Sequence, residues 1–115
     1  MRYFGFVLVT IGLLLPAWAR ANDYPTQARV MYVLECMQEN GNQFALVYKC
    51  SCALDRIAKK MNYDDFDAGL TIAHYRHMPG DRGGETRDPK NVNVWYKQFT
   101  QAQDDAWHAC GIPKK

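Results

Sequence analysis

The chain has 115 residues, of which 48% are hydrophobic and 23% are charged. This length suits one domain with a small core. The 14 Lys and Arg residues barely exceed the 12 Asp and Glu residues, so a nucleic-acid-binding surface, which needs a clear excess of positive charge, is not indicated.

The N-terminal segment has the features of a secretory signal. Arg2 supplies a positive charge, residues 4–15 form an apolar run, and small residues recur in the A-x-A pattern up to Ala21. Signal peptidases recognise this arrangement, and the run is shorter than the about 20 residues that cross a bilayer. We therefore expect a signal peptide at residues 1–21 and a single helical domain at residues 22–115. Because the signal lacks a lipobox cysteine, we expect a periplasmic protein with no stable membrane anchor after cleavage.

Hydrophobic spacing predicts four helices and no strand. The first covers residues 25–39, with Asp23 or Thr26 as its cap, and the Asn and Gly residues at 40–42 end it. The second covers residues 43–60 and is capped by Asn42. Apolar residues recur at helical spacing in both helices: Val30, Val33, Leu34 and Met37 in the first, and Val47, Cys50, Leu54, Ile57, Ala58 and Met61 in the second.

The third predicted helix begins at Asn62 or Asp64 and ends near His77, before Pro79. Its predicted core side chains are Phe66, Leu70 and Ala73.

A glycine-rich loop at residues 79–87 leads into the fourth predicted helix. Asp88 followed by Pro89 is a common helix opening, because the aspartate accepts a backbone hydrogen bond and proline suits the first turn. This helix reaches Cys110 and is the most aromatic of the four, so we expect it at the centre of the core. The predicted fold class is all-α, a small disulfide-stapled bundle of about four helices after a cleaved signal peptide.

The four cysteines predict two disulfides, because an even number in a small exported chain is typical of such a framework. Cys50 and Cys52 point about 200° apart on one helix and cannot pair with each other. Cys36–Cys50 with Cys52–Cys110 is favoured over Cys36–Cys52 with Cys50–Cys110, since Cys36 lies opposite residues just before Cys50 in a hairpin that turns at Gly41. A soft-metal chelate at the C-x-C sequence is the disfavoured alternative, because it needs unpaired thiolates.

A signal followed by a helical bundle stapled through Cys36, Cys50, Cys52 and Cys110 resembles several families of small bacterial periplasmic proteins. They include acid-stress chaperones, secreted-toxin immunity proteins and accessory proteins of periplasmic oxidation systems. The resemblance implies a small exported protein and assigns no site residue.

Two histidines form the candidate metal site. His74 and His77 lie one helical turn apart and could share a copper or zinc ion, with His108 of the last helix as a third ligand. The simpler alternative is that His74 packs beside Leu70 while His77 interacts with the negative end of the helix dipole. No other cofactor is expected.

The loop at residues 79–87 is the candidate partner-binding site. Arg76, Arg82, Arg87 and Lys90 surround its three glycines with donors suited to a carboxylate or phosphate. It matches neither the P-loop nor the dinucleotide fingerprint, both of which follow a strand. The simpler alternative is a solvated connector whose charged side chains pair with each other.

The sequence offers no convincing catalytic constellation. Ser51, the only serine in residues 22–115, lies between two cysteines, and no strained turn exposes it. His108 with Asp104 and Asp105 is the other fragment, and single residues of these types on a helix are usually surface groups.

The leading hypothesis is a non-catalytic exported accessory protein that binds another exported protein. Arg2 and Arg20 belong to the predicted signal, so residues 22–115 carry 12 basic and 12 acidic side chains and no net charge, which again disfavours nucleic acid as a partner. A periplasmic metal-binding protein using His74 and His77 is the first alternative. A small secreted hydrolase or an inhibitor of the immunity type is the second. No oligomeric state is indicated.

The exported protein should begin at Asn22, because the cut is expected after Ala21. N-terminal sequencing and intact-mass measurement check this, and thiol counting should find four thiols only after reduction. An exported chain that keeps residues 1–21 would contradict the prediction.

Overall fold

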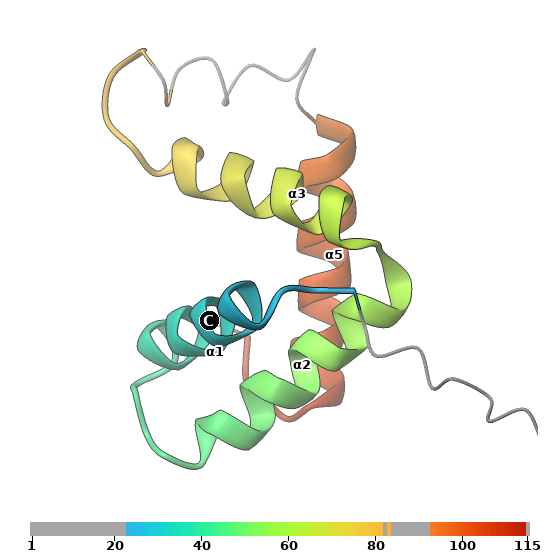
Figure 1. Cartoon of the computed structure of the whole chain (residues 1–115). Helices are drawn as coiled ribbons and strands as arrows, with labels where there is room; N and C mark the ends of the chain where they lie inside the picture. The colour runs from blue at the N-terminus through green and yellow to red at the C-terminus, as the bar shows by residue number, and fades with distance from the viewer. Residues whose placement is uncertain (1–22, 82, 84–92, 115) are drawn as a thin grey trace, which may run out of the picture.

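The computed structural model describes residues 23–81, 83 and 93–114 (Figure 1). Its helices are α1 (Thr26–Glu39), α2 (Leu46–Lys60), α3 (Tyr63–Arg76) and α5 (Asn93–Ala109). No strand occurs among the described residues, and none of the described helices is both long enough and apolar enough to cross a membrane. The predicted all-α class is confirmed. The predicted opening of the last helix at Asp88 and Pro89 lies outside the described residues.

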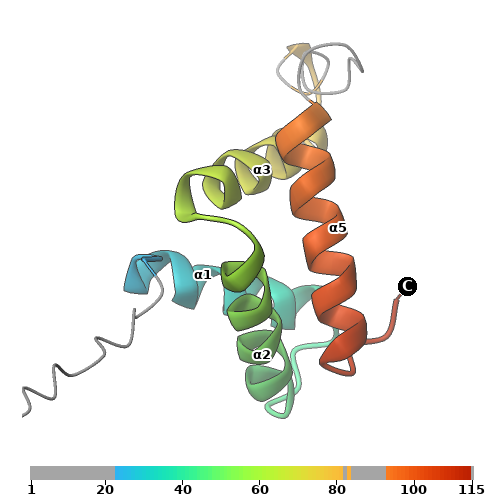
Figure 2. The same cartoon turned by 90° about the vertical axis from the view of Figure 1, so that its right-hand side faces the viewer.

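The helices α2 and α5 each pack against two others. The α5 helix packs against both α2 and α3, while α1 packs against α2. Figure 2 shows α3 beside the N-terminal part of α5 and α2 beside its C-terminal part. In Figure 1, α1 and α3 extend toward the same side of α5. The last helix contributes to the core, as expected, through the buried side chains of Phe99, Ala102 and Ala106.

Two disulfides fix this arrangement, with the connectivity that the sequence favoured. Cys36 of α1 is bonded to Cys50 of α2 across a Cα–Cα distance of 5.9 Å, and Cys52 of α2 is bonded to Cys110 after α5 across 6.0 Å. They close loops with sequence separations of 14 and 58 residues. Loss of chain entropy in the unfolded state makes such crosslinks worth roughly 3 and 4 kcal/mol. For a small bundle, this is a large share of the stability.

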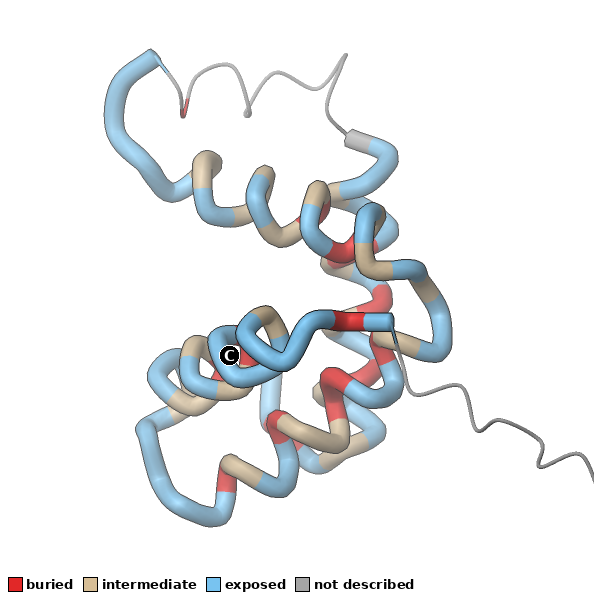
Figure 3. The backbone as a smooth tube through the Cα atoms, in the orientation of Figure 1, coloured by how far each residue is buried: buried red, intermediate tan, exposed pale blue. Residues whose placement is uncertain are grey.

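The core is centred on Phe66 of α3, which is 1% exposed. Figure 3 marks the buried positions of the described helices in red. Its ring lies 4.7 Å from that of Tyr24 and 5.7 Å from those of Tyr32 and Phe99, measured between centroids. Aromatic pairs at such distances add to the energy of burial. The other largest fully buried side chains are Phe99, Leu54, Ile57 and Cys50. The predicted core stripe of α2 is therefore confirmed at Cys50, Leu54 and Ile57.

The stop between α1 and α2 follows the predicted chemistry. Gly41 and Asn42 have φ values of 102° and 57°, in the left-handed region that these two residues tolerate. The Asn42 N–H donates to the Met37 carbonyl at 2.7 Å and so satisfies a carbonyl at the end of α1.

The helix starts were predicted less well. Asn62 caps α3 as expected, because its side-chain oxygen accepts from the Asp65 N–H at 2.8 Å. The predicted cap of α2 at Asn42 is wrong, since that residue closes α1 and α2 begins only at Leu46. The predicted caps of α1 are also wrong: Pro25 precedes the helix and no side chain caps it.

The C-terminal residues are tied back to the bundle. Gly111 has a φ of 74°, and the Ile112 N–H donates to the Trp107 carbonyl at 2.9 Å. Ile112 is buried as a result. Lys49 of α2 donates to the Gly111 carbonyl at 3.1 Å, next to the Cys52–Cys110 bridge. The last helix ends at Ala109, one residue before the predicted end at Cys110.

Replacing Gly69 by alanine should destabilise the protein by about 1–3 kcal/mol, because α3 and α5 meet at this glycine. A Cβ there would collide with the Phe99 Cβ and lie 3.0 Å from the Trp95 carbonyl oxygen. Chemical denaturation measures the change. The control is Thr71→Ala on the exposed side of α3, which should change stability by less than about 0.5 kcal/mol. Equal stability of the two variants would contradict the close approach.

Candidate functional site

The predicted partner-binding arginines are placed only in part. Arg82, Arg87 and Lys90 lie outside the described residues. Arg76 is the last residue of α3, and its guanidinium carbon lies 4.4 Å from the centroid of the Tyr96 ring on α5. A cation over an aromatic face is attracted to it, so the Arg76 side chain is held against α5. Its role in partner binding stays a prediction.

The three histidines occupy two separate places. His74 and His77 both line a cleft of about 180 Å³ formed by α1, α3 and α5, which we call the α1–α3 cleft. His108 lies on α5 and lines a different hollow, near the C-terminus, together with Asp104 and Lys114. The structure thus brings together two of the predicted metal ligands and places the third elsewhere.

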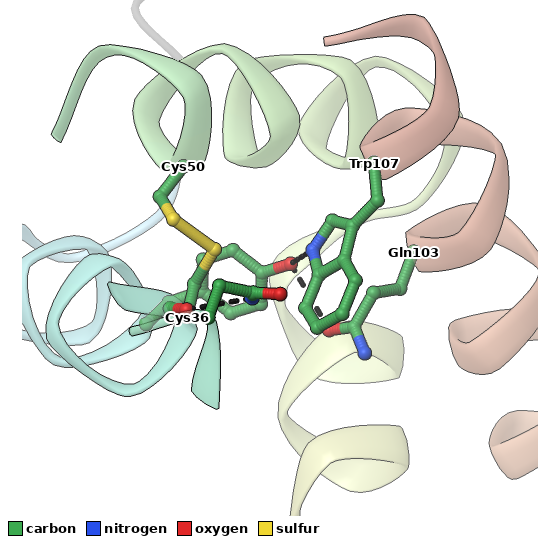
Figure 4. Close-up of a disulfide and its surroundings, with 6 residues drawn as sticks. Cys36, Cys50, Gln103 and Trp107 are labelled. Carbon is green, nitrogen blue, oxygen red and sulfur yellow. Dashed lines mark hydrogen bonds between the residues drawn. A yellow bond between two sulfur atoms is a disulfide. The ribbon is translucent and has the colours of Figure 1, made fainter. Parts of the chain in front are cut away.

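The α1–α3 cleft has a polar inner wall (Figure 4). The Tyr32 hydroxyl donates to Gln103 Oε1 at 3.0 Å and accepts from the Trp107 indole N–H at 3.1 Å. Burial raises the pKa of Tyr32 well above its ordinary value, since removal from water disfavours the phenolate. The hydroxyl therefore stays neutral and keeps its donor proton. The Cys36–Cys50 bridge lies beside this network and fixes the α1 backbone that carries Tyr32.

A carboxylate–imidazole contact crosses the mouth of the same cleft. Glu35 Oε2 of α1 lies 3.0 Å from His74 Nε2 of α3. The two side chains are 32% and 50% exposed, and polar pairs at such exposure contribute little to stability. The contact joins α1 to α3 across the cleft. Glu39 and His77 line the same cleft one turn further along their chain segments.

Metal chemistry through cysteine is excluded by the bridges. All four cysteines are in disulfides, so the C-x-C sequence offers no thiolate. Among the residues whose positions are described, no three His, Cys, Asp or Glu side chains are close enough, as they stand, to hold a metal ion.

A second hollow lies on the opposite side of α1, between α1 and α2. This α1–α2 groove has a volume of about 400 Å³, and no residue lines both it and the α1–α3 cleft. The apolar residues that line it are Val30, Val33, Leu34 and Met37 of α1 and Val47 and Leu54 of α2. An amphipathic helix ordinarily buries such a stripe. Here Val30 is 52% exposed and Leu34 is 54% exposed, because α1 turns Tyr32 and Cys36 toward the core instead.

The charged and hydroxyl groups of the groove are few. Arg29 and Asp55 face each other across it at 3.5 Å, and Ser51 lines it between the apolar residues. None of the described side chains that line the groove is a histidine. Ser51 therefore has no imidazole base beside it, and the groove does not support the hydrolase alternative.

Exposed aromatic side chains stand next to the groove. Tyr48, three residues before Ser51 on α2, is its surface neighbour by helical spacing and is 71% exposed. Its ring contacts that of Phe44 edge to face, with 6.2 Å between centroids. Exposed aromatic side chains of this kind are frequent anchors of protein interfaces.

Comparison with models of known protein families, with curated proteins and with solved structures found no match for this chain.

Sequence reasoning missed both carboxylates of the cleft and the outward orientation of α1. No spacing rule joins Glu35 to His74, because they lie 39 positions apart on different helices. A pattern in the sequence did indicate the exposed apolar side of α1. Two apolar sets on α1, one with Val30 and Leu34 and one with Tyr32 and Cys36, cannot both face one core.

Replacing Tyr32 by phenylalanine should destabilise the fold by about 1–3 kcal/mol, because the buried Trp107 N–H loses its acceptor and Gln103 loses its donor. Thermal or chemical unfolding measures this. Tyr48→Phe removes a hydroxyl from an exposed ring and should leave stability within about 0.5 kcal/mol of the wild type. A Tyr32→Phe variant as stable as Tyr48→Phe would show that the network contributes nothing.

Proposed function

We propose that the protein is a non-catalytic, exported binding protein that holds an amphipathic helix of another exported protein in the α1–α2 groove. The observation that carries this proposal is the exposed apolar lining of the groove, above all Val30 and Leu34. A contiguous exposed apolar surface on a small protein often marks a site where another molecule binds.

The disulfides support an exported location. They indicate an oxidising compartment, because cytosolic thiols are kept reduced. Together with the predicted signal peptide, they favour the periplasm as the place where the protein and its partner meet.

The groove is built to be rigid before a partner arrives. Its two walls, α1 and α2, are joined directly by the Cys36–Cys50 bridge. The turn between them is closed by the left-handed Gly41 and Asn42. A preformed groove loses little conformational entropy on binding, so more of the contact energy is available for affinity.

The dimensions of the groove suit a helix. Its lining on α1 extends from Thr26 to Met37, a length of about 17 Å at 1.5 Å per residue, which matches three turns of a bound helix. Apolar residues at i, i+3, i+4 and i+7 of such a helix would face Val30, Leu34 and Leu54. Arg29 lies on the α1 wall of the groove and Asp55 on the α2 wall. These two charged side chains would contact polar residues of the bound helix.

The loop at residues 79–87 remains a second place where a partner could bind. Residues 79–81 and 83 of this loop are described, and Arg76 lies shortly before it, beside Tyr96. The binding experiment therefore includes a variant of this loop.

Leu34→Glu should reduce recovery of the partner at least tenfold. The substitution removes the apolar contact of a leucine side chain with the partner, worth about 1.5–3 kcal/mol. It also places a carboxylate against apolar surface, which is unfavourable. The measurement is quantitative mass spectrometry of proteins captured from the exported fraction by immobilised wild type and variants. A helical peptide from the captured protein is then titrated against each variant.

Val94→Glu is the matched control, because Val94 is 65% exposed on α5 and does not line the groove. It should bind as the wild type does. If Leu34→Glu and Val94→Glu capture the same proteins in equal amounts, the groove is not the binding site. Loss of the partner only in the Arg82→Glu, Arg87→Glu double variant would place the site at the loop.

A further inference from the structure

We propose that the Cys52–Cys110 bridge is a thiol-exchange site of the folded protein, which a dithiol reductant opens while the Cys36–Cys50 bridge stays closed. This inference does not rest on the proposed function. It concerns the bond between α2 and the end of α5, and neither Cys52 nor Cys110 lines the α1–α2 groove.

The first argument is that the two bridges differ in their access to solvent. Cys36 is 2% exposed and Cys50 is 0% exposed, so a reductant reaches this bridge only if the core opens. Cys52 and Cys110 are both only half-buried. Exchange requires direct attack of a thiolate on a disulfide sulfur, so access decides which of two bridges reacts.

The second argument is the positive charge beside Cys52. Lys49 precedes Cys52 by three residues and Arg56 follows it by four, so both cations are its neighbours on the surface of α2. Lys49 Nζ also donates to the Gly111 carbonyl at 3.1 Å, which places this ammonium group beside the residue that follows Cys110. Nearby cations stabilise a thiolate. Cys52 is therefore a good leaving group when the bridge is attacked.

Negative charge does not cancel this effect at Cys52. Asp55 follows Cys52 by three residues, but its carboxylate lies on the side that faces α1, 3.5 Å from Arg29. Cys110 has the opposite environment, because it follows Ala109 at the C-terminal end of α5. The helix dipole is negative there and disfavours a second negative charge.

These charges assign the direction of the exchange. A thiolate of the dithiol attacks Cys110 Sγ, the bond between the two protein sulfurs breaks, and its electron pair leaves on Cys52 Sγ, which then takes up a proton. The second thiol of the reductant, as a thiolate, attacks the mixed disulfide and releases Cys110. The bridge is reduced by two electrons, and the dithiol becomes a disulfide. Cys52 then points about 200° away from Cys50 on α2, which keeps the new thiol off the buried bridge.

Opening this bridge would release the chain end and leave the bundle in place. The α5 helix stays docked through buried side chains such as Phe99 and Ala106. The walls of the groove stay joined by Cys36–Cys50. The covalent hold is lost where the chain leaves α5, just before the buried Ile112. The bridge is thus a redox-sensitive clasp on the C-terminal segment.

The test is reduction of the disulfide-bonded protein from the exported fraction with dithiothreitol under native conditions. Thiols are blocked with N-ethylmaleimide at successive times, and peptide mass spectrometry locates the label. Cys52 and Cys110 should be labelled roughly tenfold faster or more than Cys36 and Cys50, because only the first pair is accessible. The doubly labelled form should keep its helical circular dichroism. Simultaneous loss of both bridges, or earlier labelling of Cys36 and Cys50, would overturn the proposal.

Reduced glutathione, a monothiol, should trap the first step. We expect the glutathione adduct on Cys110 and a free thiol at Cys52. An adduct mainly on Cys52 would overturn its assignment as the leaving group.

Arg56→Gln should slow the opening by dithiothreitol roughly threefold or more, because the departing thiolate loses a stabilising charge. Lys97→Gln is the matched control, since it removes the same charge from an exposed position on α5, thirteen residues before Cys110. It should open at the wild-type rate. Equal rates for the two variants would show that the charge beside Cys52 does not direct the exchange.

Discussion

Cys50 and Cys52 lie two residues apart on α2, and a helix turns through about 200° between such positions. Their bridges therefore leave α2 on different sides, one to Cys36 of α1 and the other to Cys110 after α5. Three helices are joined covalently through one turn of the middle one. The α3 helix has no cysteine and is held without a disulfide, mainly by the packing of Phe66, Gly69 and the side chains of α5 that meet them.

The covalent frame explains why α1 can leave so much apolar surface exposed. A helix in a small bundle ordinarily needs its whole apolar stripe to stay docked. Here the Cys36–Cys50 bridge holds α1 on α2, and Tyr32 adds a hydrogen-bonded anchor through Trp107 and Gln103. The opposite side of α1, with Val30 and Leu34, is thus available for other contacts. One side of this helix serves the fold, and the other forms the wall of the groove.

Much of the fold could be predicted from local patterns, because local patterns determine it. The spacing of apolar residues located the helices, and Gly41 and Asn42 marked a stop. The C-x-C spacing excluded a bond between Cys50 and Cys52, and the hairpin at Gly41 favoured the observed pairing over the one alternative. The groove and the cleft could not be predicted in the same way. Glu35 meets His74 only because α1 and α3 are both placed by α2 and α5. The spacing of apolar residues in α1 indicates two apolar faces, but it does not indicate which of them packs against the core.

Gly69 was a partial indication that another helix packs closely against α3. A glycine inside a predicted helix weakens that helix and often marks a close approach of another backbone. The sequence could not say which backbone this was, and the structure shows that it is that of α5 at Trp95. The aromatic character of the last helix pointed to the centre of the bundle, yet Trp95 is 46% exposed and Phe99 supplies the buried ring.

The bridges follow one another along the chain without overlapping, from 36 to 50 and then from 52 to 110. A polypeptide that crosses a membrane from its N-terminus presents Cys36, then Cys50 and Cys52, long before Cys110 emerges. Oxidation of the thiols in the order in which they emerge therefore pairs Cys36 with Cys50, which is a native bond. Cys52 then stays a free thiol until Cys110 emerges. During that interval the thiol of Cys52 can attack the neighbouring bridge, since exchange needs only a thiolate within reach of a disulfide. In an exported chain, correct pairing of Cys52 would thus depend on how quickly the final segment arrives.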